Sequence, residues 1–149
     1  MFRNTTAEDV AFVVENMRPE DAKEWWLASG KPAVDAIRDL GEKPYVSFTL
    51  CRDGEPVAIF GATIEPETGE ATMFRFATKR WPEVVREAVK IGRRLVLPLF
   101  KEAGVKRIVA QAPYGSDVRW LELFGAKTTM GFVDAKGTHF HRFALPLAP

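Results

Sequence analysis

The stretch GVKRIVAQAPYGSDVRWLELFGAKTTMGF, residues 104–132, decides the fold. Its apolar run from Arg107 to Gln111 has the composition of a strand buried on both faces. A polar turn, PYGSD, follows and leads into a short helix from Asp117 to Phe124. Gly125 ends that helix, and Lys127 begins a second strand. The stretch therefore predicts strand, turn, short helix and strand in direct succession.

A long amphipathic helix is predicted immediately before this stretch, from Pro82 to Ala103. Its apolar residues recur every three and four positions, so one face is expected to be buried. Pro82 fits the first turn, where a missing N–H costs nothing. Pro98 removes one helical hydrogen bond and is expected to kink the last turns. Gly104 ends the helix.

Further towards the N-terminus the apolar period changes from helical to alternating, which predicts a three-stranded antiparallel meander. Asp53-Gly54 is a two-residue hairpin signal, because a type I′ turn needs positive φ at both central positions. Thr68-Gly69 marks the second turn. The expected strands run from Pro44 to Cys51, from Pro56 to Ile64 and from Glu70 to Ala77.

The two ends of the chain complete the element order. A strand from Met1 to Asn4 precedes three helices, Ala7 to Met17, Pro19 to Gly30, and Pro32 to Leu40, which ends at Gly41. Thr6 and Asp9 resemble a capping box at the first of them. A hairpin around Lys136-Gly137 pairs Lys127 to Val133 with Thr138 to Leu145. We expect a single α+β domain over residues 1–149.

Composition excludes several classes of function. The 149 residues carry a formal net charge of +1, which argues against binding to nucleic acid or membranes through overall charge. No apolar run is long enough to span a bilayer, and the N-terminus has no signal-peptide pattern. The single cysteine, Cys51, excludes an internal disulfide, and no metal-ligand spacing is present.

The element order, together with RWLELFGAK at residues 119–127, resembles the GNAT family of N-acyltransferases. The resemblance covers nearly the whole chain and implies a mixed, mostly antiparallel sheet flanked by helices. Val118-Arg119-Trp120-Leu121 and Gly125-Ala126 are also similar to the internal virion protein A family of T7-type podophages. That closer likeness implies a phage protein in the virion or host cytoplasm, with virion or host proteins as partners.

The GNAT resemblance implies a glycine-rich loop before the long helix, whose backbone N–H groups would hold the pyrophosphate of acyl-CoA. The corresponding segment, Ala77 to Glu83, contains no glycine. Pro82 removes one donor, and Glu83 would repel a phosphate. Lys79 and Arg80 remain as weak candidates for phosphate binding. We therefore expect no cofactor, with acetyl-CoA as the alternative.

The resemblance also implies a tyrosine as general acid at the position of Leu121, and leucine cannot transfer a proton. Tyr114, in the turn before the short helix, is a weak substitute. His139 and His141 share one face of a strand and could act as base or metal ligands, although a surface or interface pair is the simpler interpretation. Glu65, Glu67 and Glu70 are expected to be solvated. The sequence thus predicts no catalytic residue and no metal site.

Two features suggest protein contacts. Arg86, Lys90, Arg93 and Arg94 form a basic stripe on the long helix, which is either its solvated face or a binding patch. Trp25 and Trp26 are adjacent on a helix, so their side chains point about 100° apart. One is expected to pack on the sheet and the other to lie exposed, as aromatic residues at interfaces do.

Together these features predict a GNAT-like phage protein that has lost its chemistry and acts through protein–protein contacts. The alternative is an active acyl-CoA-dependent N-acetyltransferase that uses Lys79, Arg80 and backbone amides for its cofactor and Tyr114 as acid. A nucleic-acid-binding module that uses the basic helix ranks last, because the net charge is nearly neutral.

Overall fold

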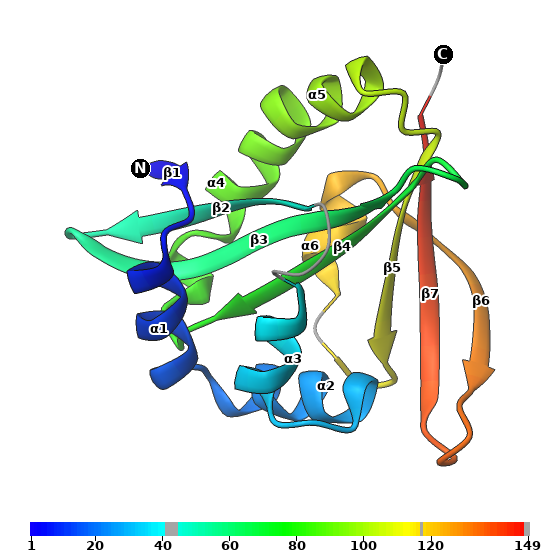
Figure 1. Ribbon diagram of the computed structural model, residues 1–149, viewed down its shortest axis with the longest axis horizontal. Helices are drawn as coiled ribbons and strands as arrows, with labels where there is room; N and C mark the ends of the chain where they lie inside the picture. The colour runs from blue at the N-terminus through cyan, green and yellow to red at the C-terminus, as the bar shows by residue number, and fades with distance from the viewer. Residues whose placement is uncertain (41–44, 117, 148–149) are drawn as a thin grey trace. The chain divides into compact units, whose positions relative to one another are not determined.

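Figure 1 shows a computed structural model of the chain, in which residues 1–40, 45–116 and 118–147 are described. The predicted helix end at Gly41, strand start at Pro44 and helix start at Asp117 lie outside these residues. The elements in chain order are β1 (Phe2–Asn4), α1 (Ala7–Glu15), α2 (Pro19–Ser29), α3 (Ala33–Leu40), β2 (Tyr45–Arg52), β3 (Glu55–Glu65), β4 (Glu70–Ala77), the 3₁₀ turn η1 (Trp81–Glu83), α4 (Val85–Ile91), the π-helical turn η2 (Gly92–Val96), α5 (Leu97–Glu102), β5 (Arg107–Pro113), α6 (Arg119–Phe124), β6 (Lys127–Val133) and β7 (His139–Pro146).

The strands form a seven-stranded sheet in the order β1-β2-β3-β4-β5-β7-β6. β4 and β5 pair in parallel, whereas β1 with β2, β2 with β3, β5 with β7 and β6 with β7 pair antiparallel. The fold is therefore α+β, with a mixed, mostly antiparallel sheet flanked by helices, as the sequence predicts. No helix in the described part of the chain is long and apolar enough to cross a membrane.

The chain divides into two compact units. The first unit comprises Met1–Thr63 and Phe74–Val85, and the second comprises Ile64–Met73 and Arg86–Pro149. Both the β3–β4 turn and the start of β4 thus belong to the second unit. That the whole chain is one domain stays a prediction.

In the first unit, the local signals in the sequence are confirmed. The Thr6 hydroxyl accepts from the Asp9 N–H at 3.2 Å, and the Asp9 carboxylate accepts from the Thr6 N–H at 3.0 Å, which is the predicted capping box. Asp53 and Gly54 have φ values of 55° and 75°, as a type I′ turn requires. α1 and α3 then pack on β3 and β4 through a core that contains Val13, Ile37, Ile59 and Phe76.

The predicted helix from Pro82 to Ala103 is not continuous. It consists of η1, α4, η2 and α5 in succession. In η2 the Leu97 N–H donates to the Gly92 carbonyl, five residues back. The Phe124 ring packs so closely on Gly92 that a Cβ atom there would lie 2.3 Å from ring carbon Cε2. Pro98 stands in the first turn of α5, where its missing N–H is tolerated, so the break precedes the proline.

Candidate functional site

The loop from Thr78 to Val84 in the first unit includes most of the segment that the GNAT resemblance assigns to phosphate binding. Most of its backbone N–H groups are used internally. The Arg80 N–H donates to the Thr78 hydroxyl at 3.3 Å, and the Trp81 N–H to the Thr78 carbonyl at 3.0 Å. The Glu83 and Val84 N–H groups donate to the carbonyls of Arg80 and Trp81. Pro82 has no N–H to offer, so this loop does not fit a pyrophosphate held by backbone amides.

Arg80 is held by two carboxylates of the same unit. Its guanidinium donates to Asp53 at 2.8 Å and to Glu83 at 2.9 and 3.0 Å. The hydrogen bonds to Glu83 and then to Asp53 raise the pKa of the Arg80 guanidinium above its ordinary value. Because these anions already balance its charge, Arg80 is poorly placed to attract a phosphate. Lys79 next to it is exposed and remains a candidate for that role.

In the first unit, the edge of β4 opposite β3 is covered by α2 and the residue before it. The Arg18 N–H donates to the Ala77 carbonyl at 2.9 Å, and the Trp25 indole N–H donates to the Arg75 carbonyl at 3.1 Å. The Asp21 carboxylate is completely buried beside the guanidiniums of Arg18 and Arg75. Burial raises the pKa of Asp21, although Arg75 and Arg18 oppose the rise.

Sequence reasoning missed this buried group of Arg18, Asp21 and Arg75. Arg18 and Asp21 stand three residues apart at the start of α2, which is the one local signal for their ion pair. Arg75 comes from β4 and also lies 5.0 Å from the centre of the Trp81 ring. The group anchors α2 to the end of β4 through contacts that a single sequence does not indicate.

In the second unit, Tyr114 lies next to His139 and His141. The Tyr114 ring stacks on the His141 ring with a centroid distance of 3.9 Å and an interplanar angle of 11°. The His139 ring lies 5.5 Å from that of Tyr114. The Tyr114 hydroxyl lies over Gly131, where an added Cβ would be 2.4 Å away. His141 Nδ1 is buried and has no hydrogen-bond partner among the described residues.

This cluster, Tyr114, His139 and His141, is the strongest candidate for proton transfer in the described chain. A phenol and two imidazoles are groups that exchange protons in enzymes. Tyr114 directly follows β5 and is half exposed. Leu121 is buried in α6 and has no proton to give. No group of three metal-ligating side chains occurs among the described residues.

The remaining predicted residues are placed as follows. Glu70 is not a free acid, because it pairs with Arg107 and with Arg142. Trp25 packs edge-on against Phe74 and Phe76, while Trp26 is 54% exposed, which confirms the expected division between the two. The two other acidic residues and the four residues of the basic stripe are exposed, namely Glu65, Glu67, Arg86, Lys90, Arg93 and Arg94. Cys51 is buried. Whether the basic stripe or Trp26 binds a partner stays a prediction.

Comparison with known proteins gives a clear answer on fold alone. No family model and no curated protein matches the sequence. Solved structures do match. One is the ribosomal-protein-S18-alanine N-acetyltransferase of Escherichia coli, with a TM-score of 0.67 and 16% identity over 100% of this chain and 94% of that one. Another is a probable acetyltransferase from Staphylococcus epidermidis, with a TM-score of 0.72 and 11% identity over 99% of both chains.

A third match is the aminoglycoside acetyltransferase AAC(6')-Ib in complex with ribostamycin and coenzyme A, with a TM-score of 0.70 and 16% identity over 98% of this chain and 92% of that one. The same enzyme is solved with paromomycin and acetyl-CoA. These complexes contradict our expectation of no cofactor, because proteins with this fold hold coenzyme A or acetyl-CoA. The seven-stranded sheet and the neighbours at these TM-scores together show that the chain has the GNAT fold.

Proposed function

We propose that this chain is an acyl-CoA-dependent N-acyltransferase. The observation that carries the proposal is the match of nearly its whole length to acetyltransferases, some of them solved with coenzyme A or acetyl-CoA. When bound, acyl-CoA supplies an activated acyl group in the form of a thioester. The proposal replaces the expectation that the chain takes no cofactor.

The chain's own residues limit how it can take such a ligand. The N–H groups of Arg80, Trp81, Glu83 and Val84 in the loop are engaged, and the Arg80 guanidinium is paired with Asp53 and Glu83. Lys79 is therefore the residue that we propose to attract the phosphates. Its ammonium group is a solvated point charge. Such a contact is weak and depends on salt, because a surface charge is screened within roughly 10 Å at 0.1 M ionic strength.

Tyr114 is the group that we propose to hold the exchangeable proton. Its ring stacks on His141, and its hydroxyl occupies the place that a side chain at position 131 would fill. Such positioning keeps a donor in place without a covalent constraint. His141 lies beneath the ring and is proposed to position it.

Tyr114→Phe tests this assignment, because it removes the hydroxyl and keeps the ring that stacks on His141. Thiol release from acetyl-CoA is measured with a panel of primary amines. We expect kcat to fall about 100-fold or more, as for the loss of a general acid. The control is Met130→Leu, an exposed position on β6, which should leave kcat unchanged. An unchanged kcat in Tyr114→Phe would remove Tyr114 from the mechanism.

A second candidate function is a GNAT-fold scaffold that no longer catalyses transfer and acts through protein contacts. The internally bonded loop around Pro82 and the basic stripe that includes Arg86, Lys90 and Arg93 favour it. Its proposed partners are phage virion or host proteins, and its proposed location is the virion or the host cytoplasm. Mass spectrometry of purified phage particles tests that location, and absence of the chain from them would contradict it.

A further inference from the structure

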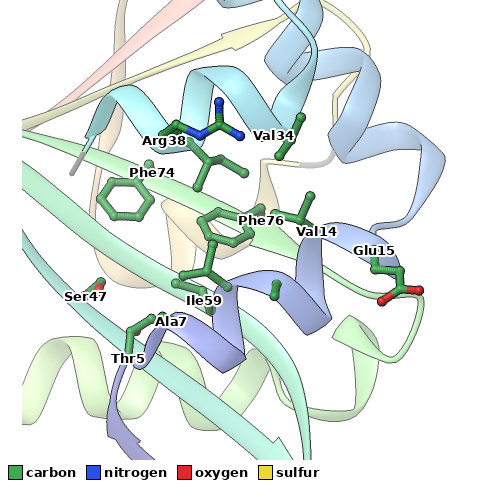
Figure 2. A pocket seen from close by; sticks show the side chains of 13 residues that line it. Thr5, Ala7, Val14, Glu15, Val34, Arg38, Ser47, Ile59, Phe74 and Phe76 are labelled. Carbon is green, nitrogen blue, oxygen red and sulfur yellow. The ribbon is translucent and has the colours of Figure 1, made fainter. Parts of the chain in front are cut away.

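A pocket of about 520 Å³ lies inside the first unit, between α1, α3 and the strands β2, β3 and β4 (Figure 2). Its walls are Val10 and Val14 from α1 and Val34 and Ile37 from α3. Its volume is in the range of small-molecule sites, which is about 300–1,000 Å³. None of the residues discussed above for phosphate binding or proton transfer lines it.

The floor of the pocket is apolar and firmly packed. Ile59 and Phe76 are each 1% exposed, and Phe76 stacks on Phe74 with a centroid distance of 6.3 Å. Trp25 holds the two rings by edge-on contacts at 6.5 and 5.9 Å. Above this packed floor, a flat apolar body that enters the pocket meets the partly exposed side chains of Val10, Val14 and Phe74. Contact with them favours the body by dispersion and by release of water.

Two charged residues, Arg38 and Glu15, line the rim of the pocket, and only Arg38 has an ion-pair partner among the described residues. Arg38 lines it from α3, but its guanidinium faces the Asp35 carboxylate of the same helix at 3.5 Å. Glu15 lines it from α1 and has no ion-pair partner among the described residues. Glu15 is also the last residue of α1, whose last turn holds no basic residue. A carboxylate at the negative end of a helix dipole leaves a local negative potential that favours a cation.

We propose that this pocket binds a small amphipathic amine, with an aromatic or branched apolar body between α1 and α3 and a cationic ammonium group next to Glu15. The apolar floor selects the body, and the unbalanced carboxylate selects the charge. Figure 2 shows Glu15 at the end of the α1 wall, with Phe74, Phe76 and Ile59 in the same pocket. The site is a binding site in its own right and does not depend on the proposed acyl transfer.

Tryptamine is the probe that tests the proposal, with indole-3-propionate as its anionic counterpart. Each is titrated into the full chain without acetyl-CoA, by calorimetry and by melting temperature. A ligand that binds only the native state must raise the melting temperature. We expect tryptamine to bind at millimolar concentration or below, and at least about tenfold more tightly than indole-3-propionate. No binding of tryptamine, or equal binding of the two, would overturn the proposal.

Two substitutions locate the binding. Val14→Phe fills the pocket and should weaken tryptamine binding more than tenfold, while circular dichroism confirms that the variant is folded. Glu15→Gln should weaken it about two- to fivefold, the range for a partly solvated charge pair. The control is Glu8→Gln, the same change on an exposed residue of α1 outside the pocket, which should bind as the native chain does. Native affinity in a folded Val14→Phe chain would place the binding elsewhere and contradict the proposal.

Discussion

At the scale of single residues, Gly92 and Asp9 each have a specific structural role. Gly92 is a helical glycine whose role is to admit the Phe124 ring. Asp9 is 2% exposed and closes three contacts at the start of α1, with the Thr6 N–H, the Thr6 hydroxyl through its own N–H, and the Arg3 guanidinium at 2.6 Å. Both can be tested by substitution.

Gly92→Ala should destabilise the chain. Alanine improves helix propensity by about 1 kcal/mol, but its Cβ would meet Phe124 at 2.3 Å, inside a well-packed contact. Overpacking of this kind costs about 1–3 kcal/mol, so the clash outweighs the gain. Chemical denaturation measures the free energy of unfolding. Arg93→Ala, on the next and exposed residue, is the control and should change it by less than about 0.5 kcal/mol. A more stable Gly92→Ala chain would refute the close contact.

Asp9→Asn should destabilise the chain at neutral pH and progressively less in acid. Burial raises the pKa of Asp9, but the hydrogen bonds from Arg3, Thr6 and Thr49 together outweigh it and leave the pKa lowered. A lowered native pKa means that the ionised carboxylate favours folding above the ordinary aspartate range of about 4 and loses that contribution as pH falls through the native pKa. At pH 7 the loss should be about 1–3 kcal/mol. A difference from the native chain that stays constant down to low pH would contradict this.

At the scale of elements, the predictions from sequence succeeded where signals are local. The type I′ turn at Asp53-Gly54, the capping box at Thr6 and the αL cap of α2 at Gly30 each depend on a few neighbouring residues. The π-helical turn at Gly92 was missed because it is set by Phe124, a residue distant in sequence. Pro98 indicated that the long helix is interrupted, but it did not indicate where the interruption lies.

For the candidate sites too, local features were predicted from the sequence, whereas contacts between distant residues were not. Leu121 and the glycine-free loop could be identified from short motifs, and they lie in α6 and directly after β4. The stack of Tyr114 on His141 depends on the pairing of β5 with β7, and the pocket depends on the packing of α1 and α3 on the strands. A single sequence gives no register between strands that no hairpin joins and no distance between helices, so neither could be predicted.

The attachment of α2 to β4 is testable through the tryptophan pair. Trp25→Phe keeps an aromatic ring against Phe74 and Phe76 but removes the hydrogen bond to the Arg75 carbonyl, which should cost about 0.5–1.5 kcal/mol or more. Trp26→Phe should be nearly neutral, because Trp26 is 54% exposed. Equal effects of the two substitutions on the free energy of unfolding would show that the indole N–H of Trp25 does not anchor α2.

At the scale of the whole molecule, a shared fold is separate from a shared activity. The GNAT fold is present, with 11–16% identity to the acetyltransferases compared above. The loop that would face the phosphates uses most of its N–H donors internally. In the proposed function, acyl-CoA would be held with one exposed lysine, Lys79, in place of an amide cradle.

The basic stripe is a surface feature whose role is separable from stability. Replacing Arg86, Lys90 and Arg93 together with Glu should change the free energy of unfolding little, because none of the three is buried. If the stripe is only solvated, binding to a protein partner should be unaffected. If it is an interface, binding measured by calorimetry should fall and the native chain's binding should weaken with salt.

Titration of acetyl-CoA into the purified chain, at low ionic strength, tests the central claim most directly. We expect measurable heat and a rise in melting temperature at millimolar ligand or below, with a stabilisation of about 2.7 kcal/mol once the ligand reaches a hundred times its Kd. Lys79→Glu should weaken the binding, whereas Lys101→Glu, on the exposed side of α5, should not. Neither heat nor a change in melting temperature at millimolar acetyl-CoA would contradict the proposal that this GNAT-fold chain takes acyl-CoA.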